Sequence, residues 1–427
     1  MSTFDLPQKK GTLMKPNKSN LSTLKQICQL IPPHLVNKLA KKHGIRTRKF
    51  SAWSHVATLL YTQLSHSLSL NDVCDSLNNH SSSLNKIREA TPPKRNTLSN
   101  ANRTRNSALA EDLFWEVLKS LQGSMPQFGI ERQYSGFPQR FKRAIYAVDS
   151  TTIQLLANCM DWAKHRRRKA AAKCHMQLNL QTFLPSCAIV KEANTHDSTE
   201  AREVCANIKD GEIVVFDKAY VDFKHLNHLD KRGVNWVTRS KDNMVYEVIR
   251  EHTQVKGSIL KDQVIKLTGI KASKLYEQEL RLVEAEVIID GKLKALTFIT
   301  NNFKWAPSSI ASLYQARWGI EVFFKQIKQN LKLADFLGYN KNAIQWQVWT
   351  ALLTYVLLRF LAFRSGWKHS FSRIFTLIRG VLWNHLELNS VLKCCGTASD
   401  PPKIRSAPDQ AYLPKFKEAL DGTAIVF

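Results

Sequence analysis

The sequence is short of acidic residues. Its 427 residues include 35 Asp and Glu against 62 Lys and Arg, which gives a formal net charge of +27. The excess is spread along the chain and is not confined to one tail. A protein this basic is expected to bind a polyanion, most often nucleic acid. The alternative is a basic surface that serves only solubility.

Cysteines with metal-binding spacing are also missing. The eight cysteines form no C-x-x-C motif and no Cys/His zinc pattern. The adjacent pair Cys394 and Cys395 suits neither a zinc knuckle nor an ordinary disulfide. We therefore expect free thiols in a reducing cytoplasm.

Long hydrophobic runs are absent from the sequence. The first 18 residues are polar and basic without an apolar core, which argues against a signal peptide. The most apolar run, Val348 to Leu358, has eleven residues and is too short to span a bilayer. It predicts a buried helix instead. We expect a cytoplasmic protein without a membrane partner.

The N-terminal part of the chain has the pattern of helices. After a flexible basic arm over residues 1–20, apolar residues recur at helical spacing through residues 21–135. Pro92 and Pro93 break this pattern, and Asn96 or Thr97 is expected to cap the next helix.

The helix expected after the two prolines is basic and polar. It carries Arg103 and Arg105, and a short predicted helix with Ser69 as its cap precedes it. This arrangement suits a helix-turn-helix that reads DNA, with the two arginines as DNA contacts. An ordinary small helical bundle with a basic face is the alternative.

From residue 140 to about 345 the pattern is that of a mixed α/β domain. Strands are expected near residues 143–149, 175–183, 186–193, 212–217 and 234–240, with helices at 197–208 and 221–231. The segment 162–171 is expected to be a basic loop. Three strands, a helix, a strand, a helix and a fifth strand match the order of a ribonuclease H-like core.

A β-rich block is expected as an insertion in this domain, over residues 243–300. Asp290 and Gly291 form a hairpin signal within it. A helical C-terminal region and tail are then expected over residues 346–427.

Three carboxylates are candidates for a metal site. Asp149 and Asp217 each follow an apolar strand, and Glu321 lies on a helix expected over residues 308–331. Such an all-oxygen site suits two Mg²⁺ or Mn²⁺ ions. For each aspartate alone, a turn or a helix cap is the alternative. Other aspartates that could compete for the role are Asp161, Asp197 and Asp222.

Glu321 shares one face of its predicted helix with other polar side chains. At 100° per residue, Tyr314, Arg317, Glu321 and Lys328 fall within an arc of roughly 60°, and Lys325 lies near it. This face could hold a metal and a polyanion together. A solvated charged stripe is the alternative.

Several motifs resemble a known family. AVDSTTIQL, the DKAY after a β run, and Y-x2-R-x3-E-x6-K resemble the DDE transposases of bacterial insertion sequences. Within these, the chain resembles the group with the YREK signature, the insertion-sequence-four family, over about residues 30–385.

The resemblance implies a ribonuclease H-like core with a β insertion before the last acidic residue. It implies Asp149, Asp217 and Glu321 as catalytic metal ligands. It further implies that Tyr314, Arg317 and Lys328 bind phosphates beside the scissile bond, while Lys325 is a DNA-binding candidate from its charge alone.

The implied activity is cut-and-paste DNA transposition. Two subunits would pair the terminal inverted repeats, cleave them by metal-dependent hydrolysis through a hairpin intermediate, and join the 3′-hydroxyl ends to target DNA. Two alternatives remain: a structure-specific nuclease of the same fold, and a catalytically silent DNA-binding protein derived from a transposase.

Overall fold

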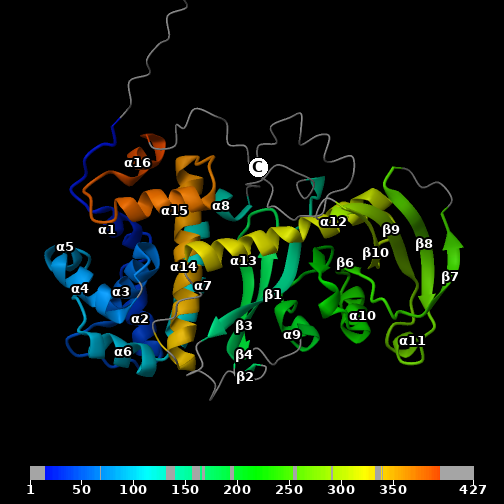
Figure 1. The fold of residues 1–427 in the computed structure, drawn as a ribbon, viewed down its shortest axis with the longest axis horizontal. Helices are drawn as coiled ribbons and strands as arrows, with labels where there is room; N and C mark the ends of the chain where they lie inside the picture. The colour runs from blue at the N-terminus through cyan, green and yellow to red at the C-terminus, as the bar shows by residue number, and fades with distance from the viewer. Residues whose placement is uncertain are drawn as a thin grey trace, which may run out of the picture.

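The protein is described from a computed structural model. The structure describes residues 15–67, 69–130, 140–155, 164–165, 169–192, 197–252, 257–289, 292–331, 338 and 340–394. Within these ranges a helical part packs against the end of a long, mixed β-sheet (Figure 1).

The N-terminal part is helical, as predicted. Its helices are α1 (Thr23–Cys28), α2 (Leu35–Lys42), α3 (Ala52–Ser65), α4 (Leu70–Asn79), α5 (Ser81–Asn85), α6 (Arg95–Thr104), α7 (Ala108–Ser124) and α8 (Gln127–Ile130). Ser69 caps α4 as expected, since its side chain accepts a hydrogen bond from the Asp72 amide. The expected cap of α6 is wrong, because the extended Lys94 precedes a helix that begins at Arg95 without a side-chain cap.

The central sheet contains ten strands. They are β1 (Ile145–Leu155), β2 (Lys164–His165), β3 (Lys169–Asn179), β4 (Pro185–Glu192), β5 (Ile213–Phe216), β6 (Asn235–Arg239), β7 (Tyr246–Glu251), β8 (Ile259–Leu267), β9 (Leu280–Ile289) and β10 (Lys292–Thr300). The expected basic loop at 162–171 is wrong in part, because β2 pairs antiparallel with the start of β3 there.

The strand order confirms the predicted core. Strands β4, β3 and β1 are antiparallel neighbours, and β1, β5 and β6 are parallel neighbours. The spatial order β4-β3-β1-β5-β6 is that of a ribonuclease H-like sheet. The parallel strands have helices in their connections, which parallel pairing requires.

The inserted strands continue this sheet. Strand β10 pairs antiparallel with β6, and β9, β8 and β7 follow in order to the far edge. Asp290 and Gly291 lie outside the described residues. The flanking residues Ile289 and Lys292 pair across strands β9 and β10, as a hairpin at this point requires.

Helices cover both faces of the sheet. One face carries α9 (Asp197–Val204), α10 (Phe223–Lys231) and α11 (Ala272–Leu275), and a 3-10 turn spans Lys218–Tyr220. The other face carries α12 (Pro307–Ala316) and α13 (Trp318–Asn330), which run in line across the strands (Figure 1). The predicted single helix over 308–331 is therefore wrong, because the chain tightens locally at Arg317, whose amide donates to the Tyr314 carbonyl at 3.1 Å.

The C-terminal helices join the N-terminal ones to the sheet. They are α14 (Lys341–Ser365), α15 (Phe371–Gly380) and α16 (Leu388–Cys394). Helix α14 packs against α3, α6, α7 and α13, so one hydrophobic core runs from the N-terminal helices to the sheet. By length and composition α14 could cross a membrane, but 94% of its most apolar window is buried inside the protein. The prediction of a buried helix is confirmed.

Candidate active site

The register of β1 and β5 sets the positions of the two aspartates. The last parallel pair joins Val148 to Phe216, and Asp149 and Asp217 are the next residues on each strand. Asp217 follows the end of β5, as predicted. Asp149 does not end its strand, because β1 continues to Leu155 in antiparallel pairing with β3.

Strand alternation puts both aspartates on one face of the sheet. Side chains two residues apart on a strand point the same way. Ala147 and Val215, two residues before the aspartates, lie in the hydrophobic core that α12 and α13 share. Asp149 and Asp217 therefore face these helices.

Close approach of α13 to the sheet depends on Gly319. A Cβ atom at this position would lie 3.0 Å from the ring of Phe183 and 3.1 Å from Leu180. The missing side chain lets the helix backbone lie against the segment between β3 and β4. The signal for this contact in the sequence is a glycine within the helix expected over residues 308–331.

The Arg317 guanidinium bridges two of the predicted carboxylates. Its Nη1 lies 3.0 Å from Oδ2 of Asp149, and its Nη2 lies 2.8 Å from Oε1 of Glu321. Only 6% of the Arg317 side chain is exposed, against 18% for Asp149 and 52% for Glu321. The structure thus brings Arg317 into contact with Asp149, which lies 168 positions earlier in the sequence.

Tyr314 brings in the third carboxylate. Its hydroxyl donates to Oδ1 of Asp217 at 3.3 Å, and the side chain is buried. The guanidinium of Arg317 lies 5.3 Å from the centre of the Tyr314 ring. Two side chains of the predicted signature therefore connect Asp149, Asp217 and Glu321 in one cluster.

Burial and charge shift the pKa values in this cluster. Burial raises the pKa of Asp149 to about 6, against the opposing effects of Arg317 and of the Ser150 amide. Burial also raises the pKa of Tyr314 to about 12. For Arg317, burial lowers the pKa, but Tyr314 and the carboxylates outweigh it and raise the pKa above its usual value. Arg317 is therefore a fixed positive charge.

Lys328 and Lys325 lie apart from the carboxylates. Lys328 is half-buried, and burial lowers its pKa, while the nearby Cys174 of β3 acts in the opposite direction. No hydrogen bond or ion pair joins it to the three carboxylates in the described part of the chain. Lys325 is exposed.

The predicted DNA contacts of α6 differ in exposure. Arg103 is exposed at the end of the helix. Arg105 donates to the carbonyls of Phe50 and Ser51, which fixes the end of α6 against the start of α3. Its predicted contact with DNA is not tested by these bonds. The basic run at 166–169 lies almost wholly outside the described residues.

The donor chemistry of the cluster fits a hard divalent cation. Its ligands would be carboxylate oxygens, which Mg²⁺ and Mn²⁺ prefer. Across the described residues, no three His, Cys, Asp or Glu side chains converge closely enough to hold a metal as they stand. The position of Arg317 between Asp149 and Glu321 accounts for this separation. A metal would need the guanidinium to withdraw.

Two protein-family profiles match the sequence. One, described as "Transposase DDE domain", matches residues 140–357, just over half of the chain. The other, described as a domain of unknown function, matches residues 19–87. The first match contains Asp149, Asp217 and the whole of α12 and α13.

Curated relatives carry transposase names. A Sinorhizobium fredii protein, y4zB, is 33% identical over 221 residues, covering 50% of this chain and 60% of the relative. A Geobacillus stearothermophilus protein named for insertion sequence element IS5377 is 28% identical, covering 52% and 58%. Transposase InsG of Escherichia coli, named for element IS4, is 25% identical, covering 43% and 42%. The chain thus spans at most about 60% of the length of these relatives.

A solved structure is also similar. The cryo-EM structure of a piggyBac transposase synaptic complex with hairpin DNA aligns with 96% of this chain and 87% of its own chain. The two sequences are 9% identical, and the TM-score is 0.42.

Proposed function

This chain belongs to the family of the transposase DDE domain, and we propose from that premise that it catalyses cut-and-paste DNA transposition. It would bind terminal inverted repeats, cleave at the transposon ends and join the 3′-hydroxyl ends to target DNA. The observation that carries the proposal is the cluster in which Arg317 joins Asp149 to Glu321 and Tyr314 joins Asp217.

We assign Asp149, Asp217 and Glu321 as the catalytic metal ligands. The family depends on divalent metal ions in general. Two Mg²⁺ ions, or Mn²⁺ in their place, would supply an activated water or 3′-hydroxyl and would stabilise the leaving oxygen. Asp149 and Asp217 would hold them from the neighbouring strands β1 and β5, and Glu321 would hold them from helix α13.

Arg317 would have two positions in this mechanism. In the structure its guanidinium pairs with Asp149 and Glu321. A bound cation would replace that charge, which would free the guanidinium for a DNA phosphate beside the scissile bond. This reconciles the observed contacts with the phosphate-binding role that family resemblance implies. Tyr314 would change partner from Asp217 in the same way.

We propose that the predicted regions of the chain have separate roles in binding and cleaving DNA. The helical region 21–135, which contains Arg103 and Arg105, would bind transposon ends, and the domain 140–345 would cleave them. Lys325 and Lys328 would contact the DNA backbone near the cut. In the structure, α14 of the helical C-terminal region packs against α3 and α7 on one side and against α13 on the other. Two subunits would pair in the synaptic complex, in the cytoplasm and associated with the nucleoid.

The triad can be tested with isosteric substitutions. Asp149→Asn, Asp217→Asn and Glu321→Gln are expected to abolish cleavage of end-containing DNA in Mg²⁺. Asp222→Asn is the matched control, because Asp222 caps α10 and asparagine caps helices equally well. Retained cleavage by any triad variant would remove that residue from the site.

A strand-transfer assay separates the proposal from a nuclease of the same fold. The transposase is expected to join a 3′-hydroxyl transposon end to a target plasmid. Cleavage without joining would favour the structure-specific nuclease. DNA binding without cleavage would favour a catalytically silent protein.

A further inference from the structure

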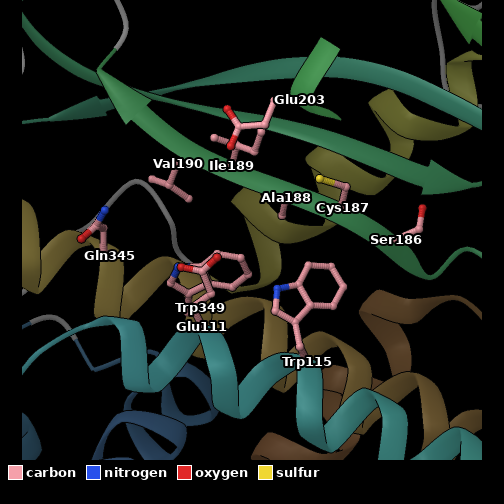
Figure 2. A pocket seen from close by; sticks show the side chains of 10 residues that line it. All are labelled: Glu111, Trp115, Ser186, Cys187, Ala188, Ile189, Val190, Glu203, Gln345 and Trp349. Atoms are coloured by element: carbon pink, nitrogen blue, oxygen red, sulfur yellow. The ribbon is translucent and has the colours of Figure 1, made fainter. Parts of the chain in front are cut away.

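A cavity of about 480 Å³ lies beside the edge strand β4 (Figure 2). None of the three carboxylates of the candidate active site lines it. Its volume is in the range of ordinary ligand pockets. Three walls form it: β4 contributes five consecutive residues, Ser186 to Val190, and helices α7 and α14 contribute two residues each. Glu203 of α9 completes the lining.

The strand wall of this cavity has an open edge. Strand β4 pairs with β3 on one side, and no other described strand pairs with it. An edge strand offers unpaired backbone N–H and C=O groups to another strand. The Asn207 side-chain amide donates to the Ser186 carbonyl at 3.1 Å. The rest of this segment, Cys187–Val190, is therefore the part able to accept an added strand.

The helical walls present aromatic and polar side chains at helical spacing. Glu111 and Trp115 lie four residues apart on α7, and Gln345 and Trp349 lie four residues apart on α14. The two indole rings lie 6.1 Å apart, centre to centre. Tryptophan faces attract lysine and arginine side chains.

The cavity is acidic in a strongly basic protein. Its lining includes two glutamates and no lysine or arginine, whereas the chain as a whole carries a net charge of +27. Glu203 pairs with Lys191 at 3.0 Å. Glu111 has no hydrogen-bond or ion-pair partner in the described part of the chain, and burial, with Asp112 and Glu203 nearby, raises its pKa. The unpaired Glu111 carboxylate is therefore the group in the cavity that a cation of a partner would neutralise.

We propose that this cavity binds an extended basic peptide of a partner protein. The peptide adds to β4 as a further strand, and one lysine or arginine side chain lies between the Glu111 carboxylate and the Trp115 ring. The charge complementarity selects the partner, and the open strand edge selects its extended form. The proposal does not depend on the function of the Asp149 cluster.

A short synthetic peptide tests the proposal. The probe is an acetylated and amidated peptide in which valine alternates with lysine, and valine alternating with glutamate is its counterpart. Isothermal titration calorimetry with the full chain at physiological salt is expected to detect the lysine peptide alone. Binding of neither peptide, or of both equally, would overturn the proposal.

Variants of the cavity sharpen the test. Glu111→Gln and Trp115→Ala are each expected to weaken binding by about tenfold, as for residues central to an interface. Glu116→Gln is the matched control, because Glu116 is an exposed glutamate of the same helix and does not line the cavity. Equal losses in Glu111→Gln and Glu116→Gln would mean general charge attraction and would overturn the proposal.

Two further measurements test whether the peptide binds by strand addition and whether a second copy of this chain occupies the cavity instead. N-methylation of the probe's backbone amides that face β4 is expected to abolish binding of the peptide. N-methylation of the amides that face away from β4 is expected to leave the affinity unchanged. Equal effects on both sides would overturn strand addition. Sedimentation velocity is expected to give the same oligomeric state for the unmodified protein and Glu111→Gln. A loss of dimer in the variant would make a second copy the occupant.

Discussion

Arg317 and Asp149 form a largely buried ion pair, with Nη1 and Oδ2 3.0 Å apart. The second guanidinium nitrogen, Nη2, holds Glu321 at 2.8 Å. One cation therefore compensates two of the carboxylates that we propose as metal ligands. This relationship makes the stability of the metal-free protein and its response to Mg²⁺ depend on the same side chain.

Arg317→Gln is expected to destabilise the metal-free protein by about 3–5 kcal/mol, because a buried Asp149 loses its counter-charge. Added Mg²⁺ is expected to raise the thermal unfolding midpoint more in the variant than in the unmodified protein, since no guanidinium has to leave. Differential scanning calorimetry with and without Mg²⁺ measures both effects. Lys325→Gln, an exposed lysine on the same helix, is the control. An equal Mg²⁺ response in both variants would contradict the exchange of Arg317 for metal.

Tyr314→Phe removes the hydroxyl that donates to Asp217 at 3.3 Å. The expected loss of stability is about 0.5–1.5 kcal/mol, the usual contribution of one hydrogen bond. Urea unfolding of the two proteins checks this. If the hydroxyl binds a DNA phosphate during cleavage, the rate of cleavage by the variant is expected to fall by more than the loss of stability explains. Unchanged cleavage would confine Tyr314 to its structural contact.

The pKa of Asp149 predicts opposite pH effects on stability and metal binding. Because this pKa rises from 3.8 to about 6 in the folded protein, the folded state keeps a proton that the unfolded chain releases between these values. The stability of the metal-free protein is therefore expected to fall as the pH rises through this window and to level off above it. Metal binding and cleavage are expected to weaken below about pH 6, where Asp149 is protonated.

Thermal unfolding across pH 4 to 7 without metal measures the first effect. Asp149→Asn provides the control, since an amide has no proton to lose. The same slope in both proteins would assign the pH dependence to other groups.

A second buried ion pair supports the helices of the site from the inserted strands. Arg281 of β9 donates from Nε and Nη2 to Asp262 of β8, each at 2.8 Å, and from Nη1 to the Trp305 carbonyl just before α12. Asp262→Asn is expected to cost about 3–5 kcal/mol, because it leaves a buried guanidinium uncompensated. Glu284→Gln breaks the more exposed pair with Lys261 and is expected to cost at most about 1 kcal/mol. Chemical denaturation distinguishes the two, and similar losses would contradict the argument from burial.

The core of the fold could be predicted from the sequence because its signals are local. Apolar runs before Asp149 and Asp217 mark strands, and the helices between strands have their own periodicity. The order of these elements along the chain predicts a ribonuclease H-like core, and the observed β4-β3-β1-β5-β6 sheet is of that kind. Helix ends were less predictable, since Arg317 separates α12 from α13 through a backbone tightening that no residue type marks.

The sequence by itself determined which side chains share a face. The spacing of Tyr314, Arg317 and Glu321 predicts a shared helix face from helix geometry alone. Asp149 and Asp217 each follow an apolar run in the sequence, although only Asp217 ends its strand in the structure. Only the tertiary structure decided that Arg317 binds Asp149 and Glu321. It also decided that the inserted strands extend the sheet and that α14 packs between the N-terminal helices and α13. These features depend on contacts between residues distant in sequence, which form only when helices and sheet pack together and exclude water.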